Sequence, residues 1–244
     1  MIGIIVQARL GSSRLPNKMI LPFYKNKGIL ELLIEKLANN FHDLPIIIAT
    51  STSKIDDTIF DLADRKNIKC FRGSENNVLD RFYKAGKFFN LTKIIRICAD
   101  NPFLNVLELK KIVNEFENSN HDYLSFQTAD KTPIIKTHYG LWAEGVTLDA
   151  LYRVKTNDLH YLEHVTNYIY EHPNEFIIKF LDIEKENNLI RLTTDTKEDF
   201  ILNKEIFVDL KRNNFTNVYE LLDYISNKKD WIIRMEEQIN KNIK

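Results

Sequence analysis

Short apolar runs alternate with amphipathic stretches along the first half of the chain. The apolar runs, which we expect to be strands buried on both faces, cover residues 2–6, 45–50, 68–71, 93–99 and 123–126. The amphipathic stretches, which have the apolar spacing of helices, cover residues 28–37, 56–67, 78–89 and 107–116. This alternation predicts an α/β fold of three layers, α/β/α, with a mainly parallel sheet in the middle.

The second half has a less regular pattern. Weak strand patterns fall within residues 133–146, 176–183 and 189–193. Helical patterns cover residues 148–153, 160–171, 198–211, 218–225 and 231–243. No internal repeat, low-complexity linker or clear boundary divides the chain. We therefore expect a single domain over residues 1–244, in which residues 133–190 form an insertion for substrate or dimer contacts.

Ligands of parallel α/β sheets bind beyond the carboxyl ends of the strands. The loop after the first strand begins at such an end. So do Thr50-Ser51, Arg72-Gly73 and Ala99-Asp100-Asn101, each of which follows a predicted strand. The topology therefore predicts that four loops converge on one site.

The first of these loops has the composition of a polyphosphate site. It contains Arg9, the small residues Gly11-Ser12-Ser13, Arg14 and Lys18. Small residues let backbone N–H groups approach an anion, and the cations neutralise the remaining charge. The loop matches neither of two well-known phosphate motifs, G-x-x-x-x-G-K-[ST] and G-x-G-x-x-G. The alternative is an ordinary strand–loop junction with solvated charges.

Two aspartates follow predicted strands and are candidates for a divalent-cation site. Asp100 precedes Asn101-Pro102, and Asp195 follows Thr193-Thr194. Magnesium prefers oxygen ligands and usually takes one or two carboxylates, with water and phosphate completing its shell. The alternatives are that Asp100 stabilises a turn and that Asp195 caps the helix that begins near Thr196.

Composition and charge narrow the classes of function. The chain is 44% hydrophobic and 28% charged, as globular proteins are, and its 34 cations balance 34 anions. This balance argues against a nucleic-acid-binding protein, which normally has a basic excess. Cys70 and Cys98 lie in apolar contexts, so we expect small buried hydrophobic residues. No signal-type segment is present, and no apolar run approaches the roughly 20 residues of a membrane span, so we expect a cytoplasmic protein.

The first loop also resembles a family signature. Its pattern resembles that of the CMP–acidic-sugar cytidylyltransferases, which include CMP-KDO synthetase and CMP-sialic acid synthetase: Ala8-Arg9-x-Gly11-Ser12-x-Arg14-x-Pro16-x-Lys18. The match is closest to the spore-coat polysaccharide branch. Two later segments are also similar: Arg96-Ile97-x-Ala99-Asp100-x-Pro102 and Arg191-Leu192-Thr193-Thr194-Asp195. Sialic-acid synthetases have D-x-D at the second of these, whereas Lys197 takes the last position here.

The resemblance implies a GT-A-like nucleotide-binding fold, a homodimer and a role for each matching residue. The implied nucleotide-binding residues are Ala8, Arg9, Gly11, Ser12, Ser13, Arg14, Lys18, Arg72, Asp80 and Arg81. Those implied in catalysis are Arg9, Lys18 and Asp100, and the implied magnesium ligands are Asp100 and Asp195. The residues implied to face the sugar or the partner subunit are Glu144, Glu163 and His164. The alternatives are a surface cation for Arg81 and a structural or interface residue for His164.

The resemblance implies a CTP-dependent enzyme. A hydroxyl of an acidic sugar, KDO-like or a nonulosonic acid, would attack the α-phosphate of CTP and release pyrophosphate, and the CMP-sugar would serve surface polysaccharide synthesis. With magnesium on the hydroxyl, no protein base is required. Three alternatives stay open. They are a nucleotide-sugar-dependent glycosyltransferase of the same fold, a cytidylyltransferase with a non-sugar acceptor, and a catalytically weak nucleotide-binding protein.

Overall fold

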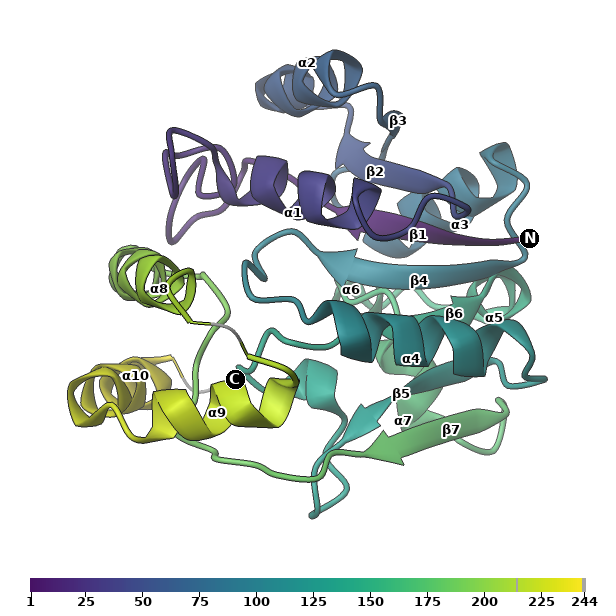
Figure 1. The fold of residues 1–244 in the computed structure, drawn as a ribbon. Coiled ribbons are helices and arrows are strands. Elements are labelled where there is room, and N and C mark those ends of the chain that lie inside the picture. The colour runs from purple at the N-terminus through teal and green to yellow at the C-terminus, as the bar shows by residue number, and fades with distance from the viewer. Residues whose placement is uncertain (214, 243–244) are drawn as a thin grey trace.

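A seven-stranded sheet forms the middle layer of the protein in a computed structural model, which describes residues 1–213 and 215–242 (Figure 1). The strands are β1 (Ile2–Gln7), β2 (Ile46–Ser51), β3 (Lys69–Gly73), β4 (Lys93–Cys98), β5 (Tyr123–Gln127), β6 (Glu144–Thr147) and β7 (Ile178–Asp182). Their order in the sheet is β3-β2-β1-β4-β6-β5-β7. Only β6 runs antiparallel to its neighbours among the described strands. The predicted mainly parallel α/β fold is confirmed.

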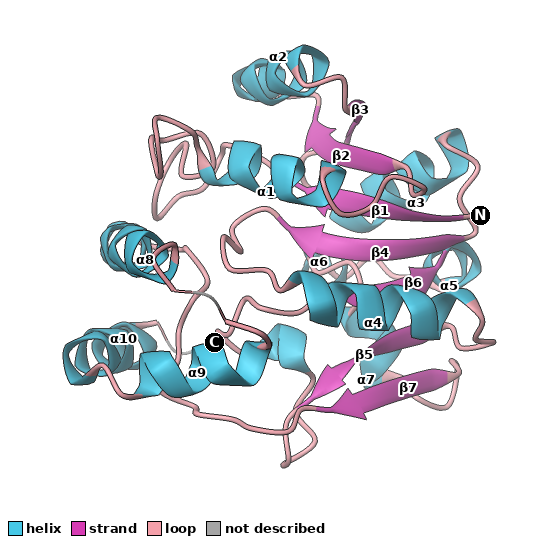
Figure 2. Ribbon diagram, in the orientation of Figure 1, coloured by secondary structure: helices cyan, strands magenta, loops and turns pink. Residues whose placement is uncertain are grey.

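Helices cover both faces of the sheet, as Figure 2 shows by colour. The helices are α1 (Ile29–Ala38), α2 (Asp57–Arg65), α3 (Val78–Phe88), α4 (Val106–Glu117), α5 (Leu148–Arg153), α6 (Leu159–Glu163), α7 (Asn167–Glu171), α8 (Lys197–Leu210), α9 (Val218–Ser226) and α10 (Lys229–Lys241), with short 3-10 turns η1 (Lys54–Asp56) and η2 (Ile134–Lys136). Alternate residues of β1 point to opposite faces. Ile4 and Val6 join one apolar core with α1, α2 and α4, and Ile5 joins a second core with α3, α5 and α7.

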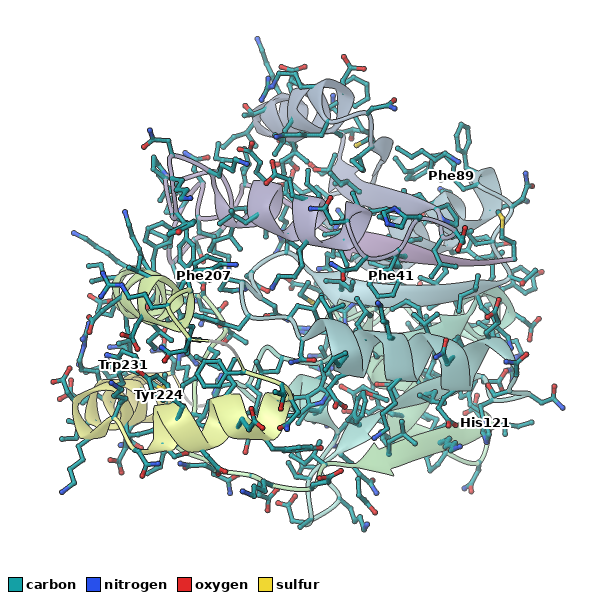
Figure 3. All side chains as sticks on the ribbon, in the orientation of Figure 1. Phe41, Phe89, His121, Phe207, Tyr224 and Trp231 are labelled. Atoms are coloured by element: carbon teal, nitrogen blue, oxygen red, sulfur yellow. The ribbon has the colours of Figure 1, made fainter. Side chains whose placement is uncertain are left out.

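Three C-terminal helices pack together beyond the carboxyl ends of β1 and β4 (Figure 1). Phe207 on α8, Tyr224 on α9 and Trp231 on α10 are labelled in Figure 3. The Phe207 ring meets Phe23 at 5.3 Å between centroids, and the Trp231 ring meets Tyr224 at 6.4 Å. Because Phe23 follows the predicted phosphate loop, these contacts fix α8 and its neighbours beside that loop.

Strand β6 approaches helix α4 unusually closely. A Cβ atom at Gly145 would lie 2.6 Å from the Phe116 ring, so the helix could not pack there against a larger residue. Gly145 therefore has a packing role. The antiparallel register places Glu144 directly opposite Arg96 of β4, so both side chains point to the same face.

Two predicted elements differ in the structure. The helix expected over residues 160–171 is divided into α6 and α7. The division occurs where the Thr166 hydroxyl donates a hydrogen bond to Glu144 at 2.9 Å instead of following the helix surface. The strand expected over residues 189–193 is a loop, because the Leu192 and Thr193 N–H groups donate to His138 and not to a neighbouring strand.

The structure also bears on the predictions for the two cysteines, the last helix and membrane spans. Cys70 and Cys98 are half-buried, because both lie near the ends of their strands. Helix α10 ends at Lys241, and residue 243, the end predicted for that helix, lies outside the described residues. No helix in the part of the chain that the structure describes is long and apolar enough to cross a membrane.

Candidate active site

A cavity of about 910 Å³ opens at the carboxyl ends of β1 and β4. The predicted site residues that line it are Arg9, Gly11, Ser12, Ser13, Arg14, Lys18, Asp100, Glu163, His164 and Asp195. The lining thus contains the first loop, both candidate metal ligands and part of the predicted insertion. Ala8, Arg72, Asp80, Arg81 and Glu144 lie outside this lining, at positions given below.

The Lys18 ammonium lies between the two candidate metal ligands. Its Nζ is 2.9 Å from Asp100 Oδ2, 3.2 Å from Asp195 Oδ1 and 2.6 Å from the Thr194 carbonyl. Only 6% of Lys18 is exposed. Burial alone would lower the pKa of Lys18, but the charges and hydrogen bonds of Asp100 and Asp195 outweigh burial and raise it. The lysine therefore remains charged and neutralises the carboxylates.

A buried ion pair holds the backbone of Asp195 in place. Asp199 Oδ2 accepts hydrogen bonds from the N–H groups of Asp195 at 3.0 Å and Thr196 at 2.9 Å. Arg191 donates two hydrogen bonds to Asp199, at 2.7 and 2.8 Å. Thr196 and Asp199 cap α8, so the alternative cap role for Asp195 is wrong. In the sequence, Asp199 has the spacing of a capping residue, but nothing there predicts its contact with Asp195.

The first loop is fixed at its start by Asp56, which the sequence did not indicate. Asp56 is buried at the end of η1 and accepts a hydrogen bond from the Leu10 N–H at 2.7 Å. The same carboxylate accepts from the N–H and hydroxyl of Ser51, at the end of β2. It therefore joins the loops that follow β1 and β2. Ala8 is fully buried just before this point, so its role is to pack the strand end and not to contact a ligand by its side chain.

The other loop cations also have carboxylate partners. Arg9 Nη2 lies 2.7 Å from Glu163 Oε1, and Arg14 Nη2 lies 3.2 Å from Asp195 Oδ1. Both arginines keep substantial exposure, so their side chains can turn toward a ligand in the cavity. The loop thus supplies mobile positive charge next to the buried Lys18.

The three residues predicted at the base and ribose have different surroundings. Arg72 donates to the carbonyls of Ser51 and Ser53 and pairs with Asp57 at 2.7 Å. Asp80 pairs with Lys84 on the same helix, at 2.8 Å. Arg72 thus joins β3 to the end of β2 and to α2, whereas the Asp80 pair lies within α3, and neither residue lies on the cavity wall.

Arg81 is fully buried, so the surface-cation alternative is wrong. Its Nη1 donates to the Ser74 carbonyl at 2.8 Å, whereas Nε and Nη2 have no hydrogen-bond partner among the described residues. Burial, with repulsion from Arg9, lowers the pKa of Arg81 to about 10. The buried Thr50 hydroxyl also has no partner among those residues. Unpaired buried donors are rare and costly, so Arg81 and Thr50 have hydrogen-bonding capacity that the described residues do not use.

Glu144 lies behind the cavity wall, with 1% exposure. It accepts hydrogen bonds from Arg96, Tyr123 and Thr166, and Arg96 also donates to Gln7 at 2.9 Å. Burial, followed by the Glu144 charge, raises the pKa of Tyr123, so its phenol stays protonated and donates. The direct sugar contact expected of Glu144 is therefore replaced by a positioning role, because its oxygens are used in holding Arg96 at the wall.

The end of the cavity away from the aspartates is built from η2, α6 and α7. Lys136 pairs with Glu171 at 2.8 Å, and the Tyr161 hydroxyl also donates to Glu171, at 3.0 Å. The rings of His160 and His164 lie 4.8 Å apart between centroids. Lys136 and Glu171 were not singled out from the sequence, because isolated charges in an irregular segment have no diagnostic spacing.

The comparisons with known proteins agree with this geometry. Residues 3–231 match the family model described as "Cytidylyltransferase". An uncharacterized protein of Methanocaldococcus jannaschii is 40% identical over 91% of this chain and 90% of its own. The spore coat polysaccharide biosynthesis protein SpsF of Bacillus subtilis is 31% identical over 94% of this chain and 95% of its own. A cytidylyltransferase structure from Leptospira borgpetersenii has a TM-score of 0.82 and 26% identity, and covers 95% of this chain and 96% of that one. The chain therefore belongs to the cytidylyltransferase family of nucleotidyltransferases.

Proposed function

We propose that the protein transfers CMP from CTP to a hydroxyl of a small acidic sugar, with release of pyrophosphate. The observation that carries this proposal is the triad of buried Lys18, buried Asp195 and half-buried Asp100 beside a loop of further cations. A site with that arrangement can hold a triphosphate, a divalent cation and an acceptor hydroxyl together. The name of the Bacillus subtilis relative supports a role in surface polysaccharide synthesis, and supply of CTP supports the cytoplasm as the place of action.

The two aspartates fit magnesium better than a transition metal. No group of three or more His, Cys, Asp or Glu residues in the described part of the chain is arranged for a metal. Two carboxylates at one point suit magnesium, which leaves its other positions to water and phosphate. When bound to Asp100 and Asp195, the ion would lower the pKa of the acceptor hydroxyl and neutralise charge on the phosphates.

The loop residues supply the remaining charge stabilisation. Arg9 and Arg14 can turn from Glu163 and Asp195 toward the β- and γ-phosphates, because both side chains are partly exposed. Gly11, Ser12 and Ser13 line the same wall. Donors aimed at the leaving pyrophosphate stabilise the charge that develops on it. Asp56 holds this loop to the end of β2 through hydrogen bonds from Leu10 and Ser51.

Arg81 is the candidate for reading the base. Its two unpaired donors fit the O2 and N3 acceptors of cytosine, since an arginine side chain can only donate. Arg72 joins the neighbouring strand β3 to the end of β2, and Asp80 pairs with Lys84 on α3 itself.

The acceptor would occupy the end of the cavity lined by residues from the 133–190 region. Lys136, Glu163, His164 and Asn167 offer charged and polar groups to a polyhydroxy acid there, while Glu144 holds Arg96 at the wall. We propose that this region also carries the contacts of a homodimer.

A substrate screen tests the proposed reaction. Each of the four nucleoside triphosphates would be incubated with magnesium and a panel of acids: KDO, nonulosonic acids and neutral sugar controls. We expect pyrophosphate release with CTP and an acidic sugar, and none with nucleotide sugars as donors. Release with a nucleotide sugar, or binding of CTP without turnover on any acid, would contradict the proposal.

Arg81→Met should affect nucleotide binding and stability in opposite directions. A lowered pKa means that the folded protein disfavours the Arg81 charge, and no carboxylate is left unpaired when it is removed. We therefore expect unfolding in urea at the wild-type concentration or higher. Hydrogen bonds to a charged group contribute about 1.5–3 kcal/mol, so the KM for CTP should rise about 10- to 100-fold. A destabilised variant with an unchanged KM would assign Arg81 to the fold alone.

A further inference from the structure

We propose that Lys18 occupies the cation site of the nucleotide-free enzyme and must leave the two aspartates before a divalent cation can bind there. The inference rests on the proposed metal role of Asp100 and Asp195. It adds that metal binding is suppressed until a nucleotide gives Lys18 another partner.

The Lys18 ammonium uses the oxygens that a cation would need. Its three N–H groups are directed to Asp100 Oδ2 at 2.9 Å, Asp195 Oδ1 at 3.2 Å and the Thr194 carbonyl at 2.6 Å. Magnesium binds oxygen at about 2.0–2.1 Å. An ammonium and a magnesium ion held by the same oxygens would lie only a few ångströms apart and would repel each other strongly in a buried place. The two cations therefore compete for these oxygens.

Contacts other than those of Lys18 hold the two segments in place. The Thr194 N–H donates to the Asp100 carbonyl at 3.0 Å, which joins the two segments directly. The Asp195 N–H is held by Asp199, and the Asp195 side chain also accepts from Thr193 at 3.4 Å. Arg14 and Arg191 also pair with Asp195, at 3.2 and 3.5 Å. Removing the ammonium thus leaves two carboxylates with less positive charge beside them, which favours a divalent cation.

The Lys18 side chain can move while its backbone stays fixed. Asn17 has φ of 60° and its N–H donates to the Leu10 carbonyl at 3.2 Å, and Met19 is buried. The lysine side chain, by contrast, is a long flexible stem, and its cavity is shared with Arg9 and Arg14. A triphosphate bound by these arginines would offer the ammonium new oxygen partners. Nucleotide binding would thus open the cation site.

Manganese titration of the nucleotide-free protein tests the competition, with free Mn²⁺ measured by electron paramagnetic resonance. Lys18→Met should bind Mn²⁺ at least about tenfold more tightly than the wild type, since Asp100 then loses the Lys18 charge while Asp195 keeps Arg14 and Arg191. Lys136→Met is the matched control, because it removes another cavity lysine and leaves a single carboxylate, Glu171. Its Mn²⁺ affinity should equal that of the wild type. The double variant Lys18→Met/Asp100→Asn should lose the higher Mn²⁺ affinity of Lys18→Met.

An Mn²⁺ affinity of Lys18→Met equal to or weaker than the wild type would overturn the inference. If Lys18→Met is unfolded without metal, circular dichroism tests the same competition. Mn²⁺ should then restore the helical signal of the folded protein, and failure to restore it would also overturn the inference. Pyrophosphate release by the wild type is measured separately. If the wild type releases pyrophosphate but Lys18→Met binds Mn²⁺ no more tightly, only the competition is rejected. If Lys18→Met binds Mn²⁺ more tightly but the wild type releases no pyrophosphate, the competition is supported and the proposed reaction is rejected.

Discussion

Asp100→Asn should lower kcat/KM for CTP by about 10²–10³-fold, the loss typical when one preorganised electrostatic group is removed from an active site. The substitution keeps the size of the side chain and an oxygen that can still accept from Lys18, now 2.9 Å from Asp100 Oδ2. It removes one of the two negative charges that would hold the divalent cation. The fold should survive because Lys18 keeps Asp195 and the Thr194 carbonyl as partners.

Three measurements define this result. Steady-state pyrophosphate release gives the loss in kcat/KM, calorimetric titration gives CTP affinity, and circular dichroism gives the midpoint of unfolding. Asp223→Asn is the control, because Asp223 is in an exposed pair with Lys185 on the far helix α9. Only the rate should change in Asp100→Asn, and no quantity should change in the control. Wild-type turnover in Asp100→Asn would remove Asp100 from the proposed metal site.

The parallel half of the fold could be read from the sequence because its signals are local. A strand covered on both faces is largely apolar, as residues 46–49 of β2 are, and the helices that cover it show one apolar face. The positions of α1 and α4 differ from the prediction by one residue at each end. The loops after β1 and β4 meet at one cavity as predicted, since parallel strands place their carboxyl ends at one edge, whereas Thr50-Ser51 and Arg72-Gly73 lie outside its lining.

The irregular half could not be read in this way because its structure depends on distant partners. Thr166 breaks the expected helix by bonding to Glu144, 22 residues away in sequence. The 189–193 segment has an apolar pattern like a strand but is held by His138 and by Met235 of α10. Such contacts depend on the complete fold and not on the spacing of neighbouring residues.

The candidate site also has a part that the sequence predicts and a part that depends on distant contacts. Its charged residues were visible as a cluster in the first loop and as strand-end aspartates, but their pairing was not. Glu144 has the sequence context of a ligand residue, yet burial assigns its oxygens to Arg96, Tyr123 and Thr166. Asp56 and Asp199 read as ordinary turn and cap residues, and only the structure gives their contacts to the loop and to Asp195.

Asp199→Ala should lower the free energy of unfolding by about 3–5 kcal/mol, the usual cost of removing one partner of a buried ion pair. Arg191 is 1% exposed and would lose both hydrogen bonds to the carboxylate. Helix α8 would also lose its capping box, which typically contributes about 1 kcal/mol. Urea unfolding followed by circular dichroism measures the loss. A decrease below 1 kcal/mol would mean that water or His138 compensates the arginine.

The same substitution should weaken the response to magnesium, because Asp199 holds the Asp195 N–H at 3.0 Å. Loss of a residue that orients a metal ligand typically costs about 10- to 100-fold in metal affinity or activity, so we expect the magnesium concentration for half-maximal rate to rise within that range. The double variant Arg191→Met/Asp199→Leu separates this effect from stability. Removing both charges leaves no buried charge unpaired, so stability should largely return, whereas the magnesium response should stay impaired since the Asp195 backbone still lacks its acceptor. A double variant that regains both would make the pair purely structural.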